Sequence, residues 1–339
     1  MNEVNSSPLS PRQRNAARRW LLLAVGAMAL SALLAILLVL SRTPGVQELF
    51  GLKAAFHTVL VMHVNFAVLI WLLSFGGVLW SLSLRRAQPL PDALAFGLSL
   101  CGALLLLAAP WVEGAAPVMS NYIPVLDTPL FLTGLIGFAS GLSLLAARVV
   151  IERLTAPHET RGTALYLAAL AWFTALALFA THAVQLSTAA TLVYEQLFWG
   201  GGHLLQFVYL LLLFAVWQAR GVNHLLVSMR ATLGLLAAAL LFGLGLEPAG
   251  ELSRRAFTQL MQFGTPLLLL PAMWTLVREK SLRHEVSLAA SFVLMALGLL
   301  IGALINGDTV TVTAHYHATN AAITVAFMGA AYELLPRLG

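Results

Sequence analysis

Charged residues are scarce in this chain of 339 residues. Asp, Glu, Lys and Arg together make up 10% of it, while 60% of the residues are hydrophobic and the mean hydropathy is +0.86. A soluble globular protein carries about 25% charged residues, so this composition excludes that class. The chain is therefore expected to lie in a membrane.

The chain has a single cysteine, and its sequence shows no evident cleavable signal peptide. Cys101 is the single cysteine, which excludes a disulfide framework, and its apolar surroundings in the sequence predict a small core residue. Residues 1–18 are polar and basic, but the apolar stretch after them is too long for a signal-peptide core and has no small-residue cleavage site. We expect a cytoplasmic N-terminal tail at 1–18 and one transmembrane domain at 19–339.

Long apolar stretches are what the chain has in abundance. Ten can be marked, at 19–41, 54–82, 93–110, 128–150, 163–186, 192–218, 224–246, 256–277, 285–306 and 314–336. Most have about 20 residues or more, as a hydrocarbon core of about 30 Å requires. Since lipid offers no partners to backbone amides, the stretches must be helices. The predicted fold is an all-α, polytopic transmembrane bundle of about ten helices.

The basic residues are distributed unevenly between the loops. With the N-terminus inside, fifteen of the nineteen Lys and Arg residues fall in inner segments, and the four outer ones are Arg42, Lys53, Arg254 and Arg255. This asymmetry follows the positive-inside rule and predicts a cytoplasmic N-terminus. It also accounts for the net charge of +5 without nucleic acid as a partner.

Five of the nine histidines lie at a similar depth, in the outer half of the predicted bilayer: His63, His182, His203, His315 and His317. One such imidazole is as often a packing residue as a ligand, but several at one depth indicate a metal cluster, a haem pair or a proton relay. The others fall in loops or at helix ends and are expected at the surface: His57, His158, His224 and His284.

His315 and His317 are two residues apart near the start of the last apolar stretch. On an α-helix such residues are about 200° apart, so the two imidazoles leave the helix on nearly opposite sides. They cannot chelate one metal ion in the way that histidines four apart can. They can serve two separate centres, one on each side of the helix.

The residue types that are missing around these histidines help to decide between a metal cluster, a haem pair and a proton relay. Zinc would favour cysteine or carboxylate partners and histidines four apart, which the chain does not offer. A proton relay would need Asp or Glu inside the apolar stretches, which hold almost none. Haem with imidazole ligands fits best, because each axial bond needs one histidine from a facing helix. A transporter bundle is an alternative, although no inverted repeat is visible to support it.

Three glycines, Gly200 to Gly202, lie between Trp199 and His203. Because glycine has no side chain, a helix can approach a flat macrocycle or another backbone closely at this point. Both interpretations stay open. In the eighth stretch, Gly264-Thr265-Pro266 and Pro271 predict a kink.

These segments together resemble subunit I of the heme-copper oxidase superfamily, which includes cytochrome oxidases and the large subunit of bacterial nitric oxide reductase. The resemblance rests on His63 in the second helix, Trp199–His203 in the sixth and His315-Tyr316-His317 in the tenth. It covers nearly the whole chain, through ten of the family's usual twelve helices. Because the chain ends directly after the tenth, we expect a fragment or a shortened relative.

The resemblance implies a role for each of four histidines. His63 and His317 would be the axial ligands of a six-coordinate, low-spin haem, and His315 the proximal ligand of a five-coordinate, high-spin haem. His203 would bind the copper or non-haem iron beside that second haem. Two haems are therefore expected as cofactors.

The chain departs from the family at the seventh helix. The family places two adjacent histidines near the outer end of that helix, where this chain has Leu241 to Leu246 and no histidine. One imidazole cannot hold copper in the usual trigonal site. His182 lies at the same depth, but on the fifth helix.

Two functions follow from these expectations. The first is a respiratory oxidoreductase subunit that passes electrons from the low-spin to the high-spin haem and on to O2 or NO. The second is a haem-binding membrane protein without the second metal, used in electron transfer or gas sensing. For the first, the expected partners are other respiratory subunits or a cytochrome c or quinol donor, in the lipid bilayer of a bacterial inner membrane.

Overall fold

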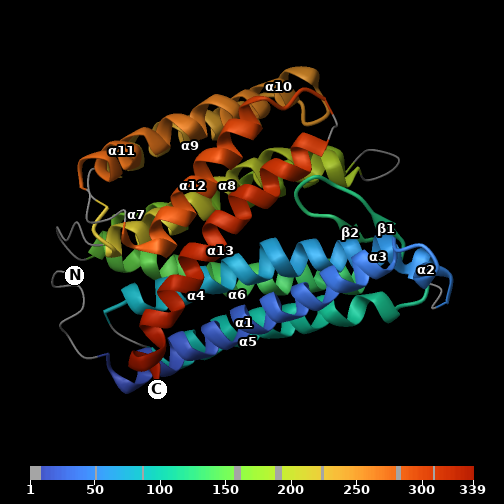
Figure 1. The fold of residues 1–339 in the computed structure, drawn as a ribbon, viewed down its shortest axis with the longest axis horizontal. Coiled ribbons are helices and arrows are strands. Elements are labelled where there is room, and N and C mark those ends of the chain that lie inside the picture. Colours follow the sequence, from blue (N-terminus) through green and yellow to red (C-terminus); the bar gives the residue numbers. More distant parts are fainter. Residues whose placement is uncertain are drawn as a thin grey trace. The chain divides into compact units, whose positions relative to one another are not determined.

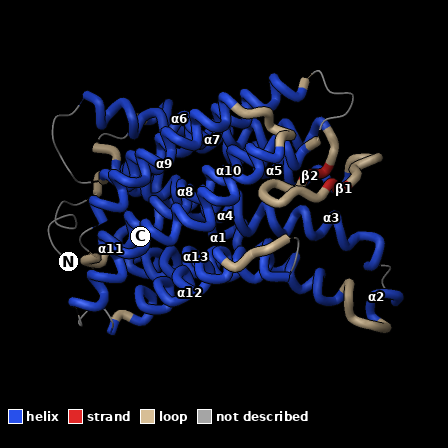
Figure 2. The backbone as a smooth tube through the Cα atoms, turned by 90° about the horizontal axis from the view of Figure 1, so that it is seen from above, coloured by secondary structure: helices blue, strands red, loops and turns tan. Residues whose placement is uncertain are grey.

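Ten of the helical segments in the computed structural model are long and apolar enough to cross a membrane (Figure 1). The structure describes residues 9–49, 52–85, 88–155, 162–187, 193–222, 225–279, 284–307 and 310–339. Within these ranges each apolar stretch of the sequence forms a helix. This confirms the all-α fold, and the protein is a multi-pass membrane protein. The strands in the described backbone form one short antiparallel pair, β1 (Pro117–Val118) with β2 (Val125–Leu126) (Figure 2).

The first of two structural units runs from Pro11 to Arg148. It contains α1 (Pro11–Leu40), α2 (Val46–Leu49), α3 (Leu52–Val64), the π-helix η1 (Asn65–Ile70), α4 (Trp71–Ser83), α5 (Pro89–Ala108), the 3-10 turn η2 (Ala109–Trp111) and most of α6 (Pro129–Thr155). α3, η1 and α4 form one continuous span that packs against α1, as Figure 1 shows. The π-helix begins two residues after His63.

α5 and α6 approach each other through glycine. A Cβ atom on Gly102 would lie 2.2 Å from the backbone nitrogen of Phe138, and one on Gly141 would lie 2.3 Å from the carbonyl oxygen of Ala95. Because lipid tails give helices no hydrophobic reason to associate, such small residues allow the close packing that holds them. The Ser99 hydroxyl adds a hydrogen bond to the Phe138 carbonyl at 3.0 Å.

The second unit holds the rest of the helices, from Val149 to Gly339. They are α7 (Thr163–Leu186), α8 (Tyr194–Ala219), α9 (Leu225–Gly245), α10 (Glu251–Gln259), the π-helix η3 (Leu260–Gly264), α11 (Thr265–Arg278), α12 (Val286–Ala303) and α13 (Val310–Leu338). α8 is the central helix of this unit, because 83% of its most apolar window is buried and it contacts α7, α9, α10 and α13. α12 and α13 form a close antiparallel pair.

The predicted kink of the eighth span coincides with a change of helix type. η3 ends at Gly264, directly before Thr265 and Pro266, and α11 continues with Pro271 inside it. Proline has no N–H to donate to the preceding turn, so the backbone hydrogen bonding must change there. Single π turns of this kind are frequent at functional sites.

One expectation from the sequence needs correction. Cys101 is exposed on α5 and is not a core residue, because α5 buries a narrow stripe that includes Ala95, Ser99 and Gly102. In addition, α1 begins at Pro11, so that residues 11–18 of the predicted tail are helical. Arg and Ala are good helix formers, which lets the helix continue beyond the apolar stretch.

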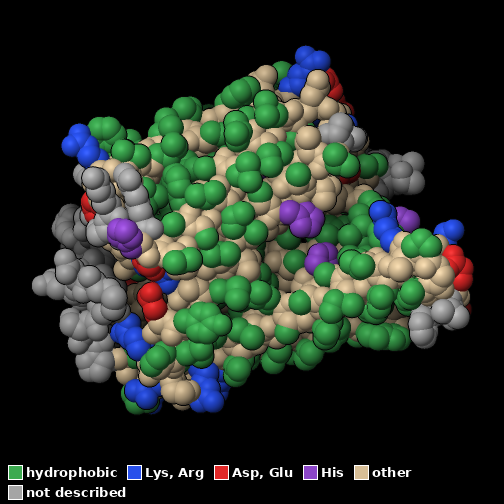
Figure 3. Space-filling model, in the orientation of Figure 1, with side chains coloured by type: hydrophobic (Ala, Val, Ile, Leu, Met, Phe, Trp, Pro, Cys, Tyr) green, Lys and Arg blue, Asp and Glu red, His purple; other side chains and the backbone are tan. Residues whose placement is uncertain are grey.

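Charged side chains gather at helix ends and hydrophobic ones cover the helix lengths, as Figure 3 shows on one face. Arg220, at the end of α8, has a side chain that is only 5% exposed. Its guanidinium lies 2.7 Å from a Glu285 carboxylate oxygen and 3.0 Å from one of Glu333. This cluster joins the ends of three helices on the side that the positive-inside rule assigns to the cytoplasm.

Candidate functional site

His63 is held by the neighbouring helix through one ring nitrogen. Its Nδ1 lies 3.0 Å from the carbonyl oxygen of Ser31 and 3.0 Å from the Ser31 hydroxyl, on α1. A carbonyl oxygen can only accept a hydrogen bond, so Nδ1 carries the proton in the neutral ring. The lone pair is then on Nε2, the nitrogen that would bind a metal.

The other three predicted ligands have the same arrangement. Nδ1 of His203 lies 2.6 Å from the Trp199 carbonyl oxygen, that of His315 lies 2.7 Å from Gly298, and that of His317 lies 2.8 Å from Thr313. Each acceptor is a backbone carbonyl, which fixes the same tautomer in all four rings. Metal-binding histidines almost always donate their second N–H in this way, which orients the ring and raises its basicity.

His315 and His317 leave α13 on different sides, as their spacing requires. The His315 ring is directed at α12, where Gly302 makes room for it: a Cβ there would lie 2.6 Å from the His315 Nδ1. His317 is exposed and bonds the carbonyl four residues earlier on its own helix. α13 therefore presents one imidazole against α12 and another at the surface of its unit.

His203 lies buried in the middle of α8, with 3% of its surface exposed. Its ring is 4.8 Å from that of Trp199 and 5.6 Å from that of Phe257 on α10, between ring centroids. Of the preceding glycines, Gly201 faces α7, since a Cβ there would lie 2.3 Å from the Phe179 ring and 2.9 Å from the Ala175 carbonyl. At Gly201 glycine therefore serves close helix packing.

His182 on α7 is more deeply buried still, with 1% of its surface exposed. Its Cε1 is 2.9 Å from the position that a Cβ would occupy on Gly200 of α8. Backbone groups of Gln196, Leu197 and Gly243 lie close to the ring, but among the described residues none meets both the distance and the angle of a hydrogen bond to either nitrogen. Gly243 belongs to the segment of α9 where the heme-copper oxidases have two adjacent histidines and this chain has none.

The structure distributes these histidines over both units. His63 belongs to the unit 11–148, whereas His182, His203, His315 and His317 belong to the other, where α8 packs against both α7 and α13. Of the remaining histidines, His57 and His284 are exposed, as expected for surface residues, and the other two lie outside the described residues. In the described ranges, no group of three or more His, Cys, Asp or Glu side chains is placed to hold a metal ion.

A polar pocket of about 530 Å³ lies at the start of the eighth span. It is lined by Trp199, Glu251, Arg254, Arg255, Thr258, Gln259 and Gln262. The Arg254 guanidinium lies 5.3 Å from the centroid of the Trp199 ring, which in turn contacts His203. The pocket is therefore separated from His203 by the Trp199 ring.

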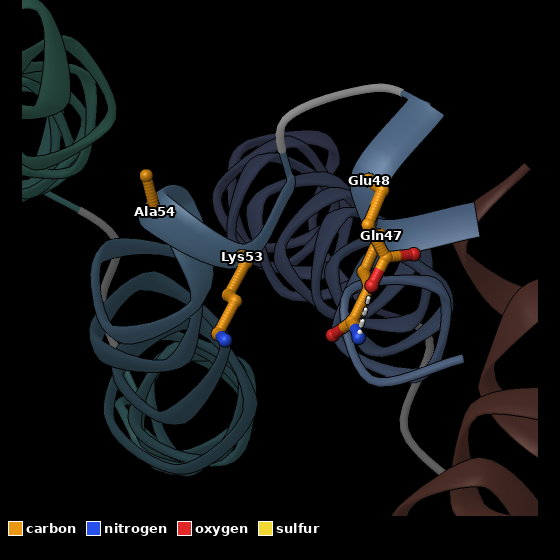
Figure 4. A pocket seen from close by; sticks show the side chains of 4 residues that line it. All are labelled: Gln47, Glu48, Lys53 and Ala54. Carbon is orange, nitrogen blue, oxygen red and sulfur yellow. Dashed lines mark hydrogen bonds between the residues drawn. The ribbon is translucent and has the colours of Figure 1, made fainter. Parts of the chain in front are cut away.

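A second pocket, of about 600 Å³, lies between α2 and the start of α3, as Figure 4 shows. Gln47, Glu48, Lys53 and Ala54 line it, and the Gln47 amide donates a hydrogen bond to Glu48 at 2.8 Å. This bond is the main cause that lowers the pKa of Glu48 below its ordinary value. Lys53 is ten residues before His63, about 15 Å along the helix, so this pocket is separate from the imidazoles.

Sequence reasoning missed the groups that orient the imidazoles. Ser31 was a possible signal, because it is the one hydroxyl-bearing residue between Trp20 and Leu40. Gly298 and Gly302 gave a weaker signal, since glycine is common in transmembrane helices. Their relation to His315 depends on how α12 packs against α13, which no local pattern specifies.

Comparisons with known proteins add relatives but no family. The chain is similar to an uncharacterized protein of Aquifex aeolicus (strain VF5), 27% identical over 343 residues, which covers 94% of this chain and 84% of the relative. It is also similar to an uncharacterized protein of Rickettsia prowazekii (strain Madrid E), 28% identical over 248 residues. That match covers 64% of this chain and 48% of the relative, so the chain spans about half the length of the Rickettsia protein. No family model and no solved structure matches the chain.

Proposed function

We propose that this protein is a haem-binding membrane oxidoreductase subunit that resembles subunit I of the heme-copper oxidases. One observation carries the proposal. Each of the four histidines singled out by the resemblance has its Nδ1 on a backbone carbonyl oxygen, which leaves the lone pair on Nε2. A neutral imidazole of this tautomer, with its ring fixed, is what an axial haem bond needs.

The chain's own residues have the following roles in this proposal. By the resemblance, His63 and His317 would hold a low-spin haem, and His315 would hold a high-spin haem. Ser31, Gly298 and Thr313 orient the three rings through their carbonyl groups. When bound, the haems would supply electron transfer from the first centre to the second and on to O2 or NO.

A second candidate is a haem protein without a further metal, for electron transfer or gas sensing. It is favoured by the absence of a group of three metal-binding side chains from the described residues. Metal analysis separates the two candidates. For the first, we place the protein in a bacterial inner membrane with other respiratory subunits and a cytochrome c or quinol donor; both relatives described above come from bacteria.

The proposal is tested on the full chain purified in detergent. We expect a reduced α-band and two haems per chain. The variant His63→Ala should lose the low-spin signal and keep carbon monoxide binding, because His315 is unchanged. His57→Ala is the matched control, since His57 is an exposed histidine on the same helix. A well-folded protein without haem would refute the proposal, and loss of carbon monoxide binding in His63→Ala would reverse the assignment of the two haems.

A further inference from the structure

His182 is the intramembrane histidine to which neither the family resemblance nor the proposed function assigns a role. Burying a polar ring without a hydrogen bond is unfavourable, so such groups call for an explanation, such as an ion that is absent from the structure. His182 has 1% of its surface exposed, and both of its nitrogens lack a hydrogen bond to the described residues. Four other imidazoles in the membrane have Nδ1 on a carbonyl group, so His182 stands apart from them.

The His182 ring is directed at the turn of α8 that precedes His203. Its Cε1, the atom between the two nitrogens, is 2.9 Å from the place of a Cβ on Gly200. Gly200 and His203 are three residues apart, which puts them on one face of α8 with Cβ positions about 5–6 Å apart. Any side chain at residue 200 would displace the imidazole, so glycine lets His182 approach His203.

Phe257 of α10 lies beside both Gly200 and the His203 ring. Its Cζ is 3.0 Å from the same Cβ position on Gly200, and its ring centroid is 5.6 Å from that of His203. Two imidazole nitrogens that share a metal ion at about 2.0 Å each are separated by at most about 4 Å. His182 and His203 both lie at the same turn of α8, so a shared ion requires only that their nitrogens come within that range.

We propose that His182 and His203 together hold a copper ion. Imidazole suits copper, and nitrogen sites bind it more tightly than the other first-row divalent metals. Cu(I) also accepts two-coordinate geometry, so two neutral imidazoles are sufficient. His182 would then supply, from α7, a ligand that the α9 segment around Gly243 lacks. The inference deepens the proposed function and rests on it for the use of the metal, whereas the ion itself can be measured apart from haem.

The test uses the purified, haem-loaded full chain, in which haem and copper are quantified on the same sample. Cu(I) is added without oxygen in competition with a chromophoric chelator. We expect one Cu(I) per chain, and His182→Ala and His203→Ala should each weaken its binding by more than about 100-fold, beyond the 10–100-fold typical of outer-shell changes. His284→Ala, an exposed histidine of the same unit, should leave the affinity unchanged.

A measurement on the unaltered protein covers the case in which a variant does not fold. X-ray absorption of the copper-loaded chain should show two imidazole ligands. One imidazole, or unchanged Cu(I) affinity in folded His182→Ala, would overturn the role of His182. A sample with two haems but no stoichiometric copper would overturn the metal site and leave the proposed function standing. A sample with copper but no haem would overturn the proposed function and leave the metal site standing.

Discussion

Four glycines, two in each unit of this protein, have different kinds of neighbour. In the unit 11–148, Gly102 and Gly141 face the backbone of the opposite helix, at the contact of α5 with α6. In the unit 149–339, Gly200 and Gly302 face the imidazoles of His182 and His315. The same residue type thus serves helix packing in one place and makes room for a ring in the other.

The neighbour of a glycine, backbone or imidazole, indicates whether it serves helix packing or the position of a ring. Where a glycine faces backbone, nothing can move aside, so a larger residue must push the helices apart. Where a glycine faces an imidazole, a larger residue can be accommodated by rotation of the ring, so the orientation of the ring changes before the helices move. Substitution to alanine should therefore affect stability at Gly102 and Gly141, and the binding of cofactors at Gly200 and Gly302.

The largest effect is expected for Gly102→Ala. The new Cβ would meet the Phe138 backbone nitrogen at 2.2 Å, so α5 and α6 must separate. We expect a loss of about 3 kcal/mol in the free energy of unfolding, with the haem content of the folded fraction unchanged. Thermal unfolding in detergent measures it. Gly97→Ala on the same helix has nothing within 4 Å of its Cβ and should change stability by less than about 1 kcal/mol. Equal effects of the two variants would contradict the packing role of Gly102.

Gly302→Ala should have a smaller effect on stability but a specific one on haem. Its Cβ would lie 2.6 Å from the His315 Nδ1, so the ring must turn and lose its bond to the Gly298 carbonyl. We expect destabilisation of about 1–2 kcal/mol. Retention of the carbon monoxide-binding haem should fall about 10-fold or more, as for other outer-shell changes.

Absorption spectra with carbon monoxide measure that loss, and Gly234→Ala on α9, where a Cβ meets nothing within 4 Å, is the control. Intact carbon monoxide binding in Gly302→Ala would contradict the role of Gly302 in making room for the His315 ring.

Ser31→Ala should have the smallest effect. The variant removes the hydroxyl beside His63, but the Ser31 carbonyl still accepts the hydrogen bond from Nδ1. We expect the low-spin signal to persist and the stability to fall by about 0.5–1.5 kcal/mol. Ser41→Ala, on the same chain segment but bonded to the Leu38 carbonyl, is the control. Complete loss of the low-spin signal would show that the hydroxyl, rather than the carbonyl, orients His63.

The fold was predictable because its main constraint is local. A span of about 20 apolar residues must be a helix in lipid, whatever its neighbours are. For that reason the ten spans match the apolar stretches, and Pro110 indeed lies in a 3-10 turn at the end of the third. The face that each helix buries is not local, which is why the prediction of a core position for Cys101 was wrong.

The candidate site was predictable to the level of residues and sides of a helix. The spacing of His315 and His317 required opposite directions, and α13 shows one ring against α12 and the other exposed. The partners of the rings were not predictable. Ser31 is 32 residues from His63 and Gly298 is 17 residues from His315, and contacts over such separations depend on helix packing.

The sequence by itself determined that the chain is a helical membrane protein, because hydropathy acts residue by residue, and it predicted five of the nine histidines at one depth. Only the tertiary structure decided the tautomers of His63 and His315, since the carbonyl groups that accept from these two rings come from a neighbouring helix. It also decided that His182 lies buried beside Gly200 without a hydrogen bond to the described residues. Whether a ring meets a polar partner depends on which helices pack together, and the order of residues along one helix does not specify that.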